Sequence, residues 1–344
     1  MTAFVDSAAP DWREQIRKNK SQSRHVIILF FLIYIAIGLL LDVYFYSTHY
    51  PTAPLSLIFQ ALIQFQLFPY ATLILFGIAS ISLWITYSLH DKIMLMGENY
   101  FEVNLQTART LEEKQLYNVV EELKIAAGMH YVPRIFIIEA DYMNAFASGY
   151  SEKSAMMAIT RGLMQKLDRD ELQAVMAHEL SHIRHLDIKL TLMAAVLSNL
   201  ILMVIDFLFY NMIYGRERSR ERKSGLLVII MLLRFVLPIV TLLLMFYLSR
   251  RREYMADAGC VALIRNNIPL AKALMKIDQD HQANKEVYIH QYEKTTNEEA
   301  RRAAYVYDPV QAGIGAIHSL SGLFSSHPTI QDRLKALGFN ESSH

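Results

Sequence analysis

The chain has 344 residues, of which 53% are hydrophobic and 19% are charged, and its formal net charge at pH 7 is +1. A mean hydropathy of +0.19 is high for a soluble enzyme and low for a transporter, so it indicates a membrane protein with a sizeable water-facing part. The near-neutral charge gives no case for a nucleic-acid partner. Because Cys260 is the single cysteine, no intramolecular disulfide can form.

Long apolar runs predict a membrane region. A helix needs about 20 apolar residues to cross a bilayer. Four stretches meet that length: 26–45, 68–89, 190–210 and 226–248. The first contains one charge, Asp42, near its end, while Asp206 and Arg234 lie in the last two. These two charges are unfavourable in lipid, so we expect them either to pair with each other or to line a cavity.

The basic residues predict the topology of these spans. Segment 1–24 carries five Lys and Arg residues, whereas the loop 46–67 carries none. By the positive-inside rule the N-terminus is cytoplasmic, the loop is outside, and residues 91–189 are cytoplasmic again. The basic loop 216–223 opposes a full crossing of 190–248. That part therefore either crosses as a hairpin, which gives four spans, or re-enters without crossing.

The water-facing part has the pattern of an α+β domain. Thr110 and Glu113 are spaced as a capping box for a helix over 111–127. The apolar runs 134–138 and 155–160 are typical of strands. We therefore expect a mainly helical membrane protein whose water-facing domain contains a small β-sheet.

A short segment between the two predicted strands is a candidate for binding a peptide. It begins with Asn144, Ala145, Phe146 and Ala147. If it forms an exposed strand edge, it can pair with an extended substrate through main-chain hydrogen bonds. The alternative is a plain hairpin edge without that role.

The central chemical signal is the sequence His178-Glu179-Leu180-Ser181-His182. Asp168 and Glu171 are spaced as the cap of a helix that contains it. On a helix, His178 and His182 lie one above the other, so both imidazoles can hold one metal ion. Glu179 can then act as a base on a water bound to that ion, as in zinc hydrolases. The alternative is an amphipathic helix that happens to carry two histidines.

A catalytic zinc ion usually takes a third protein ligand. We expect it from the helical sequence that follows three arginines, in which Glu253 and Asp257 are spaced i and i+4. Glu253 would bind the metal, and Asp257 would accept the free ring N–H of a ligand histidine and fix its tautomer. The alternative is a solvated helix start in which Glu253 pairs with the arginines.

These motifs together resemble a known family. The set comprises His178-Glu179-x-x-His182, Glu253-x-x-x-Asp257, the segment 144–149, and Ser326-His327-Pro328 with Arg333. It is similar to the M48 family of integral-membrane zinc metalloproteases and, within it, to the HtpX-like group of heat-shock proteases. The resemblance covers nearly the whole chain. It implies a gluzincin-like domain on the cytoplasmic side of a bacterial inner membrane, and a role in clearing damaged membrane proteins.

The site and the resemblance together predict a zinc metalloendopeptidase with one Zn²⁺ per chain. Its partners would be polypeptides, above all membrane proteins, and the lipid bilayer. Glu179 would be the general base. His327 is a candidate donor to the oxyanion, and Arg333 a second donor or an orienting salt-bridge partner. The alternative for each residue is a structural role, which the sequence favours for Arg333.

Other functions fit parts of the sequence. A processing protease of narrow specificity is the nearest alternative. A zinc-dependent scaffold or chaperone would not need Glu179, and a transporter would not need so large a polar domain.

The expected organisation has five parts. The polar stretch 281–302 would be a surface insertion, a lid or a disordered loop within the last of them. The parts are an N-terminal segment (1–24), two spans with a short outer loop (25–90), the first part of the catalytic domain (91–189), a transmembrane or re-entrant hairpin (190–248) and the second part of the catalytic domain (249–344).

Overall fold

The structure is a computed structural model that describes residues 12–149, 151–185, 187–214, 224–294, 304–314 and 327–339. The basic loop 216–223, Ser326 and the end of the polar stretch 281–302 therefore lie outside the described residues. The chain forms two compact units. One unit consists of residues 1–20, 89–190 and 246–344, and the other of residues 21–88 and 191–245.

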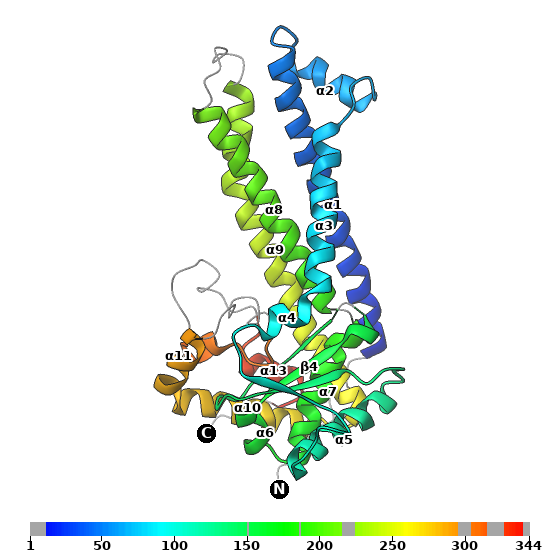
Figure 1. Cartoon of the computed structure of the whole chain (residues 1–344), viewed down its shortest axis with the longest axis vertical. Coiled ribbons are helices and arrows are strands. Elements are labelled where there is room, and N and C mark those ends of the chain that lie inside the picture. The colour runs from blue at the N-terminus through cyan, green and yellow to red at the C-terminus, as the bar shows by residue number, and fades with distance from the viewer. Residues whose placement is uncertain are drawn as a thin grey trace. The chain divides into compact units, whose positions relative to one another are not determined.

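The second unit is built from apolar helices (Figure 1). They are α1 (Trp12–His49), α2 (Leu55–Ile63), α3 (Tyr70–Ser88), α8 (Asp187–Tyr214) and the first part of α9 (Ser224–Ile264). Phe31–His49 and Tyr70–Ser88 are long and apolar enough to cross a membrane. Among the described residues of α8 and α9, the apolar parts are shorter, Ser198–Asn211 and Leu227–Thr241. Of the four expected spans, the first two therefore have the required length, and the last two are shorter among the described residues.

The charge in the first span has a structural partner. The buried carboxylate of Asp42 accepts hydrogen bonds from Ala71 N (2.7 Å), Thr72 N (3.0 Å) and Thr72 Oγ1 (2.7 Å). These N–H groups belong to the first turn of α3, where the helix offers free donors and a partial positive charge. Asp42 therefore caps α3 and holds it against α1. Gly38 allows the close approach, because a Cβ there would lie 2.7 Å from Thr72 Oγ1.

The two charges in α8 and α9 pair with each other. Arg234 Nε lies 2.9 Å from Asp206 Oδ1, and the guanidinium stacks over the Phe209 ring at 4.0 Å. Of the two alternatives open from the sequence, the structure shows the ion pair. The pair lowers the cost of placing both charges in an apolar helix pair.

The other unit contains a four-stranded mixed sheet of order β1-β2-β4-β3. Its strands are β1 (Tyr100–Val103), β2 (Arg134–Ile138), β3 (Ala145–Ser148) and β4 (Met156–Thr160). β2 and β4 are parallel, whereas β1 and β3 are antiparallel to their neighbours. The central strands β2 and β4 are almost completely buried, as their apolar sequences predicted.

Helices cover this sheet and carry the site. They are α4 (His90–Leu95), α5 (Leu111–Ala126), α6 (Arg161–Lys166), α7 (Arg169–His185), the second part of α9, α10 (Ile268–Ala283), α11 (Lys285–Lys294) and α13 (Ile330–Ala336). α7 packs against β3, α5 and α10. The predicted capping box of α5 is confirmed, because Glu113 N donates to Thr110 Oγ1 (3.2 Å) and Thr110 N donates to Glu113 Oε2 (3.2 Å).

Of the alternatives for 281–302, the disordered loop is wrong for the described part, whereas a surface insertion or a lid stays a prediction. Residues Lys285–Lys294 form helix α11, and His281, Tyr288 and Tyr292 are buried. His281 Nδ1 contacts Ile277 O (2.9 Å), and Nε2 contacts Tyr292 Oη (3.1 Å). The polar composition of the stretch did not indicate this burial. The buried groups are aromatic rings and a histidine, whose polar atoms are satisfied by hydrogen bonds within the protein.

The burial of His281 predicts acid sensitivity of this unit. Burial lowers the pKa of His281 from 6.5 to about 4, against a smaller opposing effect of its hydrogen bond to Ile277 O. As the pH falls, His281 is therefore protonated near pH 6.5 in the unfolded chain but only near pH 4 in the folded chain. Stability is fully present above pH 6.5 and falls by up to about 1.4 kcal/mol per pH unit towards pH 4. The free energy of unfolding, measured in detergent across this range, should depend less on pH in His281→Gln than in the wild type. The same pH dependence in both proteins would contradict the role of His281.

Candidate active site

Helix α7 places the two histidines. It begins at Arg169, and Asp168 and Glu171 form the expected reciprocal cap: Glu171 N donates to Asp168 Oδ1 (2.8 Å) and Asp168 N donates to Glu171 Oε2 (3.0 Å). The helix runs without interruption past His178 and His182. Their Nε2 atoms face each other at 3.2 Å, as the i, i+4 spacing predicted.

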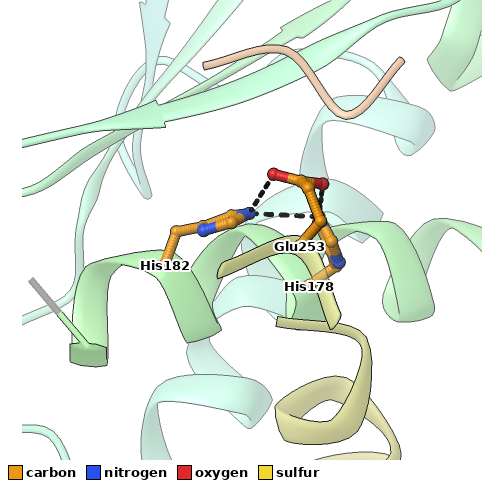
Figure 2. Close-up of side chains that lie close together, drawn as sticks. All are labelled: His178, His182 and Glu253. Carbon is orange, nitrogen blue, oxygen red and sulfur yellow. Dashed lines mark hydrogen bonds and ion pairs between the residues drawn. The ribbon is translucent and has the colours of Figure 1, made fainter. Parts of the chain in front are cut away.

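Glu253 reaches this pair from α9 (Figure 2). Its Oε2 lies 3.6 Å from His178 Nε2, and its Oε1 lies 3.5 Å from His182 Nε2. Tetrahedral zinc ligands at bonds of about 2.0–2.1 Å are about 3.3–3.4 Å apart, so these three groups fit three corners of such a site. All three residues are buried, and one ligand atom from each lies within 4.8 Å of the others. Glu253 is therefore no solvated partner of the arginines.

Asp257 lies one turn after Glu253 and holds His178 in place. His178 Nδ1 is 2.9 Å from Asp257 Oδ1, which leaves Nε2 directed to His182 and Glu253. This hydrogen bond fixes the tautomer of His178 in the way that the sequence suggested for Asp257.

Arg333 holds Asp257 in turn, so a buried chain of ion pairs connects α7, α9 and α13. Its guanidinium donates two hydrogen bonds to the carboxylate, from Nε (3.0 Å) and Nη2 (2.7 Å).

The buried charges set the protonation of the ligands. Burial alone would raise the pKa of Glu253, but the imidazoles of His327 and His178 outweigh it and hold that pKa well below its usual range. Burial would lower the pKa of His178, but hydrogen bonds to Asp257 and Glu253 outweigh it and raise that pKa to about 9. Glu253 is therefore ionised, and His178 must lose a proton when a cation binds.

Glu179 has the surroundings of a general base. Both carboxylate oxygens are buried and have no hydrogen-bond partner among the described residues. Burial raises the pKa of Glu179, although the two histidines oppose the shift. Two unsatisfied carboxylate oxygens inside a protein are unfavourable unless something else binds there. They fit a site that holds a water molecule and a cation.

His327 and Arg333 lie on the Glu253 side of the site. His327 Nδ1 is 3.2 Å from Glu253 Oε2, and Arg333 Nη1 is 3.6 Å from the same oxygen. Arg333 thus has the contacts of an orienting salt-bridge partner. A role of either residue at the oxyanion remains a prediction.

The expected exposed edge at Asn144–Ala147 differs in the structure. Asn144 lies just before β3, Ala145–Ala147 lie in it, and all four residues are buried. Phe146 forms an antiparallel bridge with Tyr305, and Val306 N donates to Ala145 O (2.8 Å). The chain's own segment therefore covers this edge. Tyr305-Val306-Tyr307 has a β-branched residue between two aromatic ones, a pattern that is typical of a short strand.

One further positioning residue was missed from the sequence. A Cβ at Gly259 would lie 2.6 Å from Ser181 Oγ and 2.9 Å from Ser181 Cβ. Gly259 thus lets α9 approach α7 closely, beside the helix turns that carry the ligands. The absence of a side chain, rather than a chemical group, makes this residue important.

Comparisons with known proteins identify a family and similar chains. The model of peptidase family M48 matches residues 110–339. A protease HtpX homolog of Helicobacter pylori (strain Shi470) is 37% identical over 322 residues, which are 94% of this chain and 96% of that protein. A protease HtpX homolog of Dictyoglomus thermophilum is 35% identical over 79% of this chain and 83% of its own. The crystal structure of S. mikatae Ste24p covers 95% of this chain and 65% of that chain, with a TM-score of 0.45 and 18% identity.

These matches define the class of the protein as a metal-dependent, membrane-associated protease. The chain belongs to peptidase family M48, as the motif combination indicated. Within that family it is similar to the proteases named HtpX homologs.

Replacing Gly259 by Ala should weaken metal binding. The added methyl group would push α9 from α7 and move Glu253 from the histidines, and overpacking of this kind costs about 1–3 kcal/mol. We expect an approximately tenfold or greater rise in the dissociation constant for Zn²⁺, measured by competition with a chelator. Gly77→Ala is the matched control, because a Cβ at Gly77 meets nothing within 4 Å. Equal affinities of the two variants would contradict this role.

Proposed function

We propose that this protein is a zinc metalloendopeptidase that cleaves misfolded or damaged membrane proteins. The observation that carries the proposal is the geometry of His178, His182 and Glu253 around one point, with the unsatisfied carboxylate of Glu179 beside it. Two imidazoles and one carboxylate are a ligand set that catalytic zinc sites use. A structural zinc site would need no base, so Glu179 favours an enzyme over a zinc-dependent scaffold or chaperone.

The residues divide the reaction between them. Zinc, when bound, supplies a Lewis acid that makes a water molecule more acidic and polarises the substrate carbonyl. Glu179 accepts the proton as the water attacks, and its raised pKa suits it to hold that proton and pass it to the leaving amine. Asp257 keeps His178 in the tautomer that binds metal, and Arg333 keeps Asp257 in place. We assign His327 and Arg333 to stabilising the substrate oxygen or the groups around it.

We further propose that substrates bind as an extended strand along β3. Main-chain pairing to a sheet edge reads the backbone rather than side chains, which suits an enzyme with many substrates. Asn144 to Ala147 would form this edge once it is free.

The proposed location is a bacterial inner membrane, with α1, α3, α8 and α9 as four crossings and the site on the cytoplasmic side. The basic residues of segment 1–24 and their absence from 46–67 support this orientation. A cytoplasmic site in a chain that is anchored by membrane helices suits substrates that are themselves in the membrane.

Glu179→Gln should abolish cleavage and keep the metal. Gln has nearly the same shape but cannot take the proton, and loss of a general base costs roughly 10²–10⁴-fold in rate. Purified protein in detergent would be tested for zinc content and for cleavage of unfolded casein and of a short defined peptide. Full activity of the variant would reject the base assignment. Cleavage of the peptide but not of casein by the wild type would instead favour a narrow processing protease.

Glu253→Ala should lower zinc content as much as His178→Ala does. Each change removes one of the three donors, and the buried site offers no solvent-exposed substitute. Metal content per chain after dialysis checks this expectation. The control is Glu122→Ala, which removes an exposed carboxylate that pairs with Arg169 at 2.8 Å. Wild-type zinc content in the Glu253 variant would remove Glu253 from the ligand set.

A further inference from the structure

The strand edge that would receive a substrate already has an occupant. Phe146 and Tyr305 form an antiparallel bridge, and Val306 N donates to Ala145 O at 2.8 Å. The ring centroids of Phe146 and Tyr305 are 5.8 Å apart. In Figure 2 a pale orange ribbon, the colour of residues just past 300, runs beside a green strand above Glu253. The occupant is residues 305–307, which we call the internal strand.

Asn144 extends this pairing with its side chain. Its Nδ2 donates to Tyr307 O (3.0 Å), and Tyr307 N donates to its Oδ1 (3.3 Å). One amide thus satisfies both main-chain groups of one residue. Together with Ala145 O, it recognises consecutive backbone units of an extended chain and makes no use of their side chains.

Arg333 connects the internal strand to the candidate metal centre. Its Nη1 donates to Val306 O (2.7 Å), while the same guanidinium binds Asp257 and lies near His178 (3.4 Å). The carbonyl of Val306 is therefore bound by the group that supports the ligand histidine. An extended peptide placed for cleavage needs the same edge, the same amide and the same neighbourhood.

We propose that the internal strand is an inhibitory segment that holds the substrate edge of β3 and must leave before an extended polypeptide can be cleaved. This rests on the proposed peptidase function. A backbone edge accepts one strand at a time, because each N–H and C=O group pairs in one direction. Binding of substrate and of the internal strand is therefore mutually exclusive.

The extent of the pairing indicates that exchange is feasible. Between β3 and β4 four residues pair in register, whereas β3 and the internal strand share one bridge among the described residues. A substrate strand would replace the main-chain hydrogen bonds one for one. A principal side-chain anchor is the Tyr307 hydroxyl, which donates to Asp278 Oδ1 at 2.7 Å.

A reversible crosslink tests the proposal. The hydrogen bond from Val306 N to Ala145 O makes Phe146 and Tyr305 a non-hydrogen-bonded pair, the arrangement with the shortest Cα separation, which suits a disulfide. Phe146→Cys with Tyr305→Cys would be made in a Cys260→Ala background and loaded with zinc. We expect casein cleavage to fall at least tenfold on oxidation and to return on reduction, with zinc content unchanged. Equal rates in both redox states would overturn the proposal.

A second measurement needs no change in the strand. In zinc-loaded Glu179→Gln protein, bound casein should speed hydrogen exchange at the Val306 amide. Slower or unchanged exchange with casein bound would overturn displacement. Absence of any cleavage by zinc-loaded wild-type protein would instead reject the peptidase function, and the inhibitory role with it.

Loosening the anchor should activate the enzyme. Tyr307→Phe removes the hydrogen bond to Asp278 and should raise kcat/KM for casein several-fold. The matched control is Tyr288→Phe, which removes a hydroxyl of α11 that donates to Asp280 Oδ2 (2.7 Å) in α10. A purely structural internal strand would give lowered or equal activity in both variants.

Discussion

The site depends on a buried chain of carboxylates, an imidazole and a guanidinium that joins three helices. Asp257 lies between His178 on α7 and Arg333 on α13, and Glu253 approaches the histidines from the same face of α9. Each charge is buried and each needs the next, because an unpaired charge in this interior would be strongly unfavourable. The same pairing that keeps the fold consistent thus directs three donors to one point.

Shape is as important as charge at this point. Gly259 allows α9 to come close to α7, and Gly38 allows α3 to come close to α1. In both places the side chain nearest the glycine is polar, Ser181 in one case and Thr72 in the other. The approach at Gly38 accompanies the hydrogen bonds of Asp42, and the approach at Gly259 brings the helices of Glu253 and His182 together.

The internal strand gives the site a second state. Val306 N donates to Ala145 O of β3, and Val306 O accepts a hydrogen bond from Arg333. Because Arg333 also lies near His178, this one arginine contacts both the internal strand and the candidate metal centre. A protease that acts on many unfolded chains also risks cutting itself and its neighbours. If the edge of β3 stays covered until a substrate competes for it, that risk is reduced. The range of substrates is not narrowed, because the edge binds the main chain of any extended polypeptide.

The sequence by itself determined what local geometry decides: the cap of α7, the i, i+4 histidines, the capping box of α5, the central strands and the apolar stretches. These features follow from spacing along one element, as does the placement of Glu253 and Asp257 on one face of α9. Only the tertiary structure decided which distant groups meet. It brought Glu253 to the histidines, buried His281 in a stretch that reads as surface, and placed Tyr305–Tyr307 on β3. Such contacts depend on packing between elements, which a single sequence does not encode locally.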